Sequence, residues 1–205
     1  MLNTKERILQ ASIRLFNEFG IDHVRLYQIA EVTGISVGNL VYHYKNKEAI
    51  IESINGQITE EFSAIVRQYL QQPGFVDFDY QIAQFYRFFG TYCFYIAEFL
   101  KTTPSSLESR TLWQELVNRM LIQLQSRLDF HVKRSDLVAP PAKEVYEALA
   151  ESIWTTLVFY QAHCAMKGIP CDEASYKNAV WRHVKPYFTE QGAAEFTTII
   201  LPLLV

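Results

Sequence analysis

The sequence has too little cysteine for a disulfide-stabilised fold and no apolar run long enough to cross a membrane. Its 205 residues include three cysteines, Cys93, Cys164 and Cys171. So few, scattered cysteines favour reduced thiols in a cytoplasmic protein over a disulfide framework. The apolar runs, including residues 198–205, are far shorter than the roughly 20 residues of a membrane span. Residues 1–7 are charged and lack the apolar centre of a signal peptide, so we expect a cytoplasmic protein.

The chain also lacks an excess of basic residues. It has 19 Lys and Arg against 22 Asp and Glu, a formal net charge of −3. This balance argues against a protein that coats nucleic acid or an anionic membrane without specificity. A local contact stays possible, because residues 1–50 carry six basic and five acidic residues, whereas residues 51–205 carry 13 and 17.

No signature of an enzyme active site or of a metal centre is present. The sequence has no glycine-rich phosphate loop, no G-x-S-x-G elbow and no H-E-x-x-H motif. His163, Cys164 and Cys171 are the one cluster that resembles metal ligands, and their spacing matches no standard zinc motif. Glu60 and Glu61 are adjacent and therefore point to different faces of a helix. We expect no catalytic site, no cofactor and no metal, with a helical metabolite-binding enzyme as an alternative.

Helical periodicity is what the sequence does show. Ile8, Ser12, Leu15, Phe16 and Phe19 recur at spacings of three and four, which predicts a helix over residues 4–19. Asn3 with Glu6 predicts its capping box, and Gly20 its C-terminal cap. Further helices are predicted over residues 27–32, 37–43 after Ser36, 47–71 after Asn46, 75–100, 105–131 after Pro104, 140–167, and 173–186 after Asp172, with a last piece from about 192. Hairpin turns and sustained alternation are missing, so the fold class is predicted to be all-α.

Residues 27–43 have the spacing of a helix-turn-helix. Two short helices at a wide angle need a small residue where they touch and a glycine in the turn, and Ala30 and Gly34 meet both needs. Leu40 is expected to anchor the second helix to the core. The exposed side of that helix would present Val37, Gly38, Asn39, Tyr42 and His43, which can contact base edges and phosphates.

On these residues, segment 4–52 resembles the TetR family of bacterial transcriptional regulators. The similarity is carried by Ala11 through Phe16 to Gly20, by Ile29-Ala30-Glu31, by Gly34-Ile35-Ser36 and by the run GNLVYHYKNKE over residues 38–48. It implies a three-helix DNA-binding head over residues 1–50 and a larger helical domain for ligand binding and dimerisation over residues 51–205. The residues expected to contact double-stranded DNA are Arg25, Tyr27, Ser36, Val37, Gly38, Asn39, Tyr42, His43, Lys45 and Lys47.

The sequence departs from the family pattern at three places. Val24-Arg25 stands where Ser or Thr usually caps the second helix, so the cap must come from elsewhere. Val41 replaces a tyrosine that often contacts DNA, which predicts the loss of one contact. Tyr44 replaces a phenylalanine and adds a hydroxyl group that needs a partner.

The larger domain is rich in aromatic residues. Residues 75–100 hold 11 aromatic and four charged residues, and a helix that is apolar all round must be enclosed by others. Either these rings form only a core, or they surround a largely apolar or aromatic ligand, as the family implies. The residues expected to line such a site are Tyr86, Phe89, Cys93, Trp113, Met120, Trp154 and Phe159.

A homodimer is expected because one short recognition helix contacts only a few base pairs, and such regulators pair two of them on a pseudo-palindrome. The family implies that segments 142–167 and 173–200 form the interface, although they could instead close the core of one subunit. The predicted function is a homodimeric repressor that a small molecule releases from its operator. A DNA-binding dimer without such an effector is the other alternative.

Overall fold

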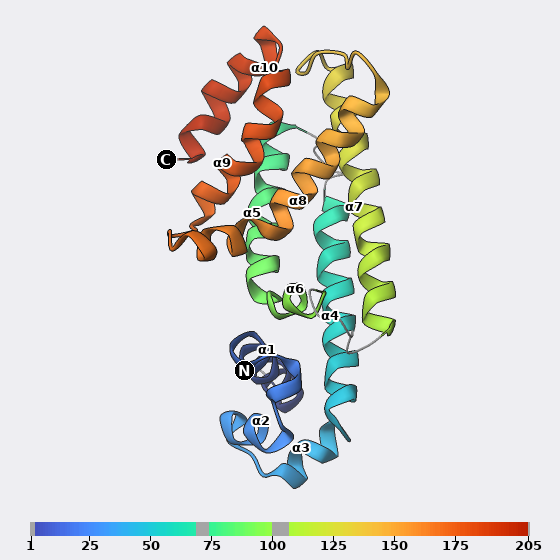
Figure 1. The fold of residues 1–205 in the computed structure, drawn as a ribbon, viewed down its shortest axis with the longest axis vertical. Coiled ribbons are helices and arrows are strands. Elements are labelled where there is room, and N and C mark those ends of the chain that lie inside the picture. Colours follow the sequence, from blue (N-terminus) through green and yellow to red (C-terminus); the bar gives the residue numbers. More distant parts are fainter. Residues whose placement is uncertain (1–2, 69–73, 100–106, 205) are drawn as a thin grey trace. The chain divides into compact units, whose positions relative to one another are not determined.

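The computed structural model describes residues 3–68, 74–99 and 107–204, and these are almost entirely helical (Figure 1). In chain order the elements are α1 (Thr4–Phe19), η1 (Ile21–His23), α2 (Leu26–Thr33), α3 (Val37–His43), α4 (Lys47–Gln68), α5 (Phe75–Thr91), α6 (Phe94–Phe99), α7 (Leu107–Lys133), α8 (Lys143–Lys167), α9 (Glu173–Val184), η2 (Lys185–Tyr187), α10 (Glu190–Glu195), η3 (Phe196–Ile200) and η4 (Leu201–Leu204). Within these residues the single β-bridge joins Leu137 and Phe188, and no strand forms. The predicted all-α fold class is confirmed.

The chain divides into two compact units. The first comprises the described residues of Met1–Glu61 and Thr91–Trp113, and the second those of Phe62–Gly90 and Gln114–Val205. The predicted division at residue 50 falls inside α4. That helix contributes to both units, because the observed boundary between Glu61 and Phe62 also lies within it. No helix in the described ranges is both long and apolar enough to span a membrane.

Helix α1 forms the centre of the first unit. Its predicted capping box is present: the side chain of Asn3 accepts a hydrogen bond from the Glu6 N–H at 2.9 Å, and the Asn3 N–H donates to the Glu6 carboxylate at 2.8 Å. The buried residues are Ile8, Leu9, Ala11, Ser12, Ile13, Leu15 and Phe16. Phe19 was expected in this stripe but is exposed, because the helix ends there and Gly20 redirects the chain at φ 77°.

The predicted single helix over residues 75–100 is wrong. The chain ends α5 at Thr91 and starts α6 at Phe94. Asn17 of α1 fills the break: its amide nitrogen donates to the Thr91 carbonyl at 2.9 Å, and its amide oxygen accepts from the Phe94 N–H at 3.0 Å. These backbone groups would lack partners at two helix ends, so a contact from a distant helix stabilises the break. The expected stop at Pro104 and the cap at Ser105 lie outside the described residues.

The aromatic residues of α5 form much of the core of the second unit. Phe85 stacks on Phe89 with ring centroids 5.8 Å apart, and Phe89 meets Trp154 of α8 edge to face at 5.8 Å. Nearer the start of α5, Phe75 and Phe78 each contact Trp181 of α9 at 5.2 Å. Such aromatic pairs add to the stabilisation that comes from burying their area. Most rings of α5 therefore have protein partners within this unit.

A buried cation also lies between α5 and α7. The side chain of Arg127 is 1% exposed, and its guanidinium donates to the Asp77 carboxylate at 3.0 Å and to the Gln81 amide oxygen at 2.9 Å. The same group lies over the ring of Phe78, 4.8 Å from the centroid. A buried charge is tolerated when it is paired in this way. The periodicity of the two helices gave no indication of this ion pair.

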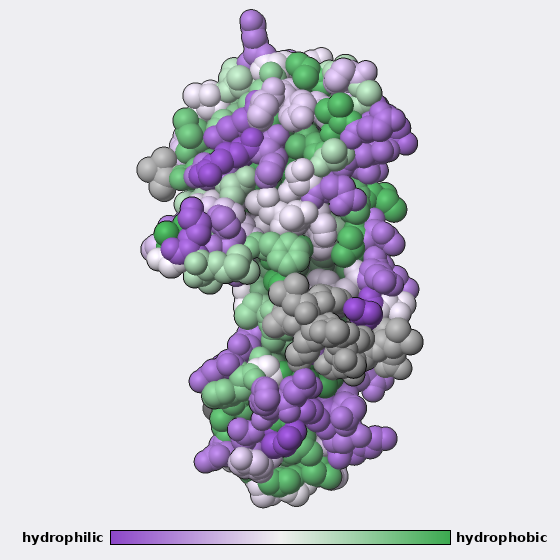
Figure 2. All heavy atoms as spheres, in the orientation of Figure 1, coloured by the Kyte–Doolittle hydropathy of each residue, from purple (hydrophilic) through white to green (hydrophobic). Residues whose placement is uncertain are grey.

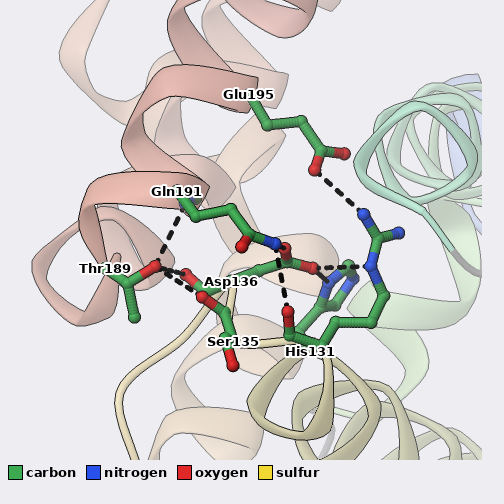
Figure 3. A network of polar contacts seen from close by, with 8 residues as sticks. His131, Ser135, Asp136, Thr189, Gln191 and Glu195 are labelled. Carbon is green, nitrogen blue, oxygen red and sulfur yellow. Dashed lines mark hydrogen bonds and ion pairs between the residues drawn. The ribbon is translucent and has the colours of Figure 1, made fainter.

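A polar network around Asp136 joins the α7–α8 loop to α10 (Figure 3). The Asp136 carboxylate is fully buried and accepts from His131 Nδ1 at 2.8 Å, Arg134 Nε at 3.1 Å and Gln191 Nε2 at 3.0 Å. Its backbone carbonyl accepts from the Thr189 N–H at 3.1 Å. Because one loop residue receives so many donors, the network fixes α10 against the end of α7.

His131 is expected to make the protein less stable in mild acid. Burial lowers the pKa of its imidazole from the ordinary value of 6.5, although Asp136 opposes this and Arg127 and Arg134 add to it. The unfolded chain therefore binds a proton more readily than the folded protein. The contribution of His131 to the free energy of unfolding is fully present above pH 6.5. It is lost as the pH falls towards the pKa of this imidazole in the folded protein. Urea unfolding at several pH values measures this slope.

The matched variants for this prediction are His131→Gln and His163→Gln. His131→Gln should flatten the pH dependence, whereas the exposed His163 should leave it unchanged on substitution. Some slope should persist in both, because burial also lowers the pKa of His183. An equal slope in wild type and His131→Gln would contradict the prediction.

Candidate nucleic-acid interface

The turn between α2 and α3 has the geometry that the sequence predicted. Gly34 adopts the left-handed conformation, with φ 73° and ψ 36°, which a residue with a side chain adopts at a cost. The Ile35 N–H donates to the Ala30 carbonyl at 3.0 Å, which closes α2 and turns the chain towards α3. Ala30 is buried at this contact. The small residue and the glycine therefore hold the two helices as a rigid pair.

Helix α3 is held at its start and on its inner side. The Ser36 hydroxyl accepts from the Asn39 N–H at 3.1 Å, so the predicted cap is present. Leu40 is fully buried and anchors the helix in the first unit. Asn46 caps α4 by accepting from the Ala49 N–H at 3.0 Å. These contacts leave the opposite side of α3 facing outward.

That outward side carries most of the residues predicted to bind DNA. Tyr42 is 85% exposed and Val37 is 44% exposed. Ser36, Gly38, Asn39 and Lys45 are exposed as well, and His43 is half-buried with its ring 5.3 Å from that of Tyr42. Figure 2 shows hydrophobic atoms among hydrophilic ones where α3 lies in Figure 1. Tyr27 of α2 is exposed too. The predicted residues thus share one unit and, apart from His43 and Lys47, are open to solvent.

Two of the three predicted cations outside α3, Lys47 and Arg25, have protein partners. The Lys47 ammonium donates to the carbonyls of Ile21 at 2.8 Å and Val24 at 3.3 Å. An ammonium group has three N–H donors, so one remains for a phosphate. Arg25 donates from Nη1 to the Asp22 carbonyl at 3.0 Å. Lys47 therefore also ties the start of α4 to the segment before α2, a role that the motif alone did not reveal.

Each departure from the family pattern has a structural outcome. The Arg25 N–H donates to the Gln28 side chain at 2.7 Å, which supplies a polar contact at the start of α2. The Tyr44 hydroxyl lies 3.4 Å from the Ser53 hydroxyl, so it has the partner it needs. Val41 is 41% exposed on the outward side of α3. The family pattern predicts a lost contact at Val41, but its position four residues after Val37 indicates that both valines lie on one side of the helix.

The residues expected to line an effector site do not all lie in one unit. Cys93 and Trp113 belong to the first unit, where Cys93 is exposed and donates to Asn17, and Trp113 packs on Tyr95. The other five belong to the second unit: Tyr86, Phe89, Met120, Trp154 and Phe159. Tyr86 donates to the Cys171 carbonyl at 2.8 Å. Phe89, Met120 and Trp154 are buried, whereas Phe159 is exposed on α8.

The segments expected at a dimer interface contain α8 and α9 with the elements that follow α9. These two helices pack closely on each other within the second unit (Figure 1). Three large apolar residues of the two segments are exposed: Phe159 and Met166 on α8, and Ile199 on η3. Among the described residues, no group of three or more His, Cys, Asp and Glu side chains is placed to hold a metal ion.

Comparisons with known proteins agree with this arrangement. Residues 8–54 match the model of the bacterial regulatory proteins of the tetR family. The chain is 37% identical over 65 residues to the HTH-type transcriptional regulator RutR of Escherichia coli K12. These 65 residues are 32% of this chain and 31% of RutR. The match thus spans about a third of that relative's length.

Two solved structures have the same fold over nearly the whole chain. A TetR-family transcriptional regulator from Marinobacter aquaeolei VT8 has a TM-score of 0.81 and 21% identity, over 99% of this chain and 98% of that one. The SmeT–triclosan complex has a TM-score of 0.69 and 16% identity, over 91% of this chain and 92% of that one.

The first unit contains a helix-turn-helix with the outer side of α3 exposed, and the second unit is a larger helical body. The family match and the relative both fall on the segment that holds the helix-turn-helix, and the two structures share the fold. Residues 8–54 thus match the bacterial regulatory proteins of the TetR family, and the fold of nearly the whole chain is that of a TetR-family structure. The family resemblance read from residues 4–52 is confirmed.

Proposed function

We propose that the protein is a sequence-specific DNA-binding repressor of the cytoplasm, which acts as a homodimer and is released from its operator by a small ligand. One observation carries this proposal: α3 is fixed by Ser36, Gly34 and Leu40 on its inner side while Asn39 and Tyr42 face outward. A helix held in this way fits the major groove of DNA.

The residues predicted to contact DNA divide by chemistry into two groups. Val37, Gly38 and Asn39 lie in the first turn of α3, where a recognition helix reaches base edges. The others offer hydroxyl, imidazole or cationic donors, which suit phosphate oxygens and position the protein without reading sequence. They are Arg25, Tyr27, Ser36, Tyr42, His43, Lys45 and Lys47.

Dimerisation is proposed through segments 142–167 and 173–200. A seven-residue helix reads few base pairs, so two copies must bind half-sites about 34 Å apart. Phe159, Met166 and Ile199 are exposed on these segments and would gain stabilisation by burial in an interface. An inverted repeat in DNA that the protein selects from a random pool would support this step.

A small, largely apolar or aromatic effector is proposed to bind the aromatic second unit. The fold resembles that of SmeT, the repressor of a multidrug efflux pump. One solved structure of SmeT is a complex with triclosan. The expected lining residues in this unit are Tyr86, Phe89, Met120, Trp154 and Phe159. A ligand that binds here should raise the melting temperature and weaken operator binding, since coupling between two sites is reciprocal. Operator affinity that stays constant with every bound ligand would leave a DNA-binding dimer without an effector.

Asn39→Ala is expected to relax sequence preference. An asparagine that bonds two edge atoms of adenine contributes about 1–3 kcal/mol of discrimination, so its loss should reduce specificity by roughly five- to 150-fold. Binding to unrelated DNA should change little, because phosphate contacts supply it. Fluorescence anisotropy at one fixed salt concentration, with the selected operator and a scrambled duplex, measures both.

The control for this substitution is Asn118→Ala, an exposed asparagine of α7 that should leave both affinities unchanged. A wild-type ratio of specific to unspecific affinity in Asn39→Ala would show that this side of α3 does not read bases. No sequence enrichment by the wild-type protein would reject the proposed function itself.

A further inference from the structure

The outward side of α3 carries two exposed valines and no cation, whereas many recognition helices are basic. Val37 and Val41 are 44% and 41% exposed, and their spacing of four residues places them on the same side of the helix. The seven residues of α3, VGNLVYH, include no Arg and no Lys. Neither valine is needed for the core of the first unit, since Leu40 is the buried residue of this helix.

Exposed β-branched side chains on a binding surface indicate an apolar partner group. In the major groove of DNA that group is the C5 methyl of thymine, which protrudes from the base edge. Guanine is read mainly by Arg and Lys, and adenine by Asn or Gln. Asn39, two residues along the helix from each valine, is the exposed amide of α3. The chemistry of this surface therefore suits thymine and adenine and offers no cation for guanine.

The neighbouring cations do not change this conclusion. Lys47 directs its ammonium to the carbonyls of Ile21 and Val24, and Arg25 bonds the Asp22 carbonyl. Lys45 is exposed in the loop after α3, outside the helix that enters the groove. These positions suit phosphates, which carry no sequence information.

We infer that the operator half-site is read through thymine methyl groups, contacted by Val37 and Val41, and through an adenine bound by Asn39. This inference rests on the proposed DNA-binding function and adds to it the base composition of the target. The core of each half-site is rich in A·T pairs, and the orientation of those pairs is read by which strand carries the methyl group.

Deoxyuridine provides the test, because it pairs as thymidine does and lacks only the methyl group. The operator is first selected from random duplexes, and each thymidine in the half-site is then replaced singly by deoxyuridine. Two or more positions per half-site should lose about fourfold in affinity, equivalent to ~0.8 kcal/mol for one buried methyl group. Anisotropy titrations of the full-length protein at one salt concentration give the ratio of the two dissociation constants.

At one thymidine position, Val37→Ala should bring the ratio of the deoxyuridine and thymidine dissociation constants to one, and at the other it should leave the ratio at about four. Val41→Ala should do the reverse. Both residues are exposed, so the variants should fold, and their circular dichroism checks this. Val32→Ala changes a valine of α2 that is 48% exposed and should keep every ratio at its wild-type value.

The possible failures are distinguishable. If the protein selects no sequence and binds all duplexes alike, the proposed function is wrong. If it selects a sequence whose core is G·C, or binds thymidine and deoxyuridine duplexes equally, DNA binding stands and the methyl readout is overturned. A ratio that survives in both valine variants likewise overturns the assignment to α3.

Discussion

Gly192→Ala is expected to lower the free energy of unfolding by about 3 kcal/mol, the upper part of the range for adding a methyl group to a closely packed site. A Cβ atom at this position would lie 2.1 Å from the Asp136 carbonyl oxygen and 2.9 Å from its carbon. Both are backbone atoms of a fully buried residue, so no side chain can move aside. The helix α10 or the loop must shift, and the network around Asp136 is then lost (Figure 3). Urea unfolding followed by circular dichroism measures the difference.

Gly56→Ala is the matched control within the same chain. Gly56 lies inside α4, and a Cβ there would meet nothing within 4 Å. Alanine in an open helix position should stabilise the protein by about 0.5–1 kcal/mol, because glycine loses more backbone entropy on folding. Equal effects of the two substitutions would show that α10 does not pack on Asp136 as described.

The sequence could predict the parts of the fold that are encoded by neighbouring residues. Asn3, Ser36, Asn46 and Asp172 each cap the helix that follows them, as expected. Gly34 takes the positive φ that the turn requires. Caps and tight turns depend on contacts within about four residues, so a single sequence contains the information for them. The helix-turn-helix is made almost wholly of such contacts.

Features made by distant residues could not be predicted in this way. The break between α5 and α6 depends on Asn17, more than 70 positions earlier. The ammonium of Lys47 bonds carbonyls before α2, and nothing in the motif indicates this. Asp79 and Arg127 lie in predicted helices, whose periodicity does not indicate that either charged side chain is buried. Their partners lie on other helices, so only the folded chain shows that both are buried and paired.

Lys177→Met is the second substitution with a large expected effect. The ammonium of Lys177 on α9 lies 2.7 Å from the Asp79 carboxylate on α5, and the two side chains are 10% and 3% exposed. Trp181 Nε1 donates to the other carboxylate oxygen at 3.0 Å. Removing the lysine leaves a buried carboxylate with a single neutral donor. Breaking one partner of a buried ion pair typically costs 3–5 kcal/mol, and we expect a loss of about that size in urea unfolding.

The double variant Asp79→Asn with Lys177→Met separates the lost charge from the lost packing. Asparagine keeps the oxygen that accepts from Trp181 but removes the buried charge, so the double variant should be more stable than Lys177→Met alone by about 2 kcal/mol. Lys143→Met removes a similar ion pair with Glu147 on the surface, where the lysine is 86% exposed, and should leave the free energy of unfolding almost unchanged. If Lys177→Met were as mild as Lys143→Met, the Asp79 carboxylate would have to be solvated, and α9 could not be packed on α5 through this pair.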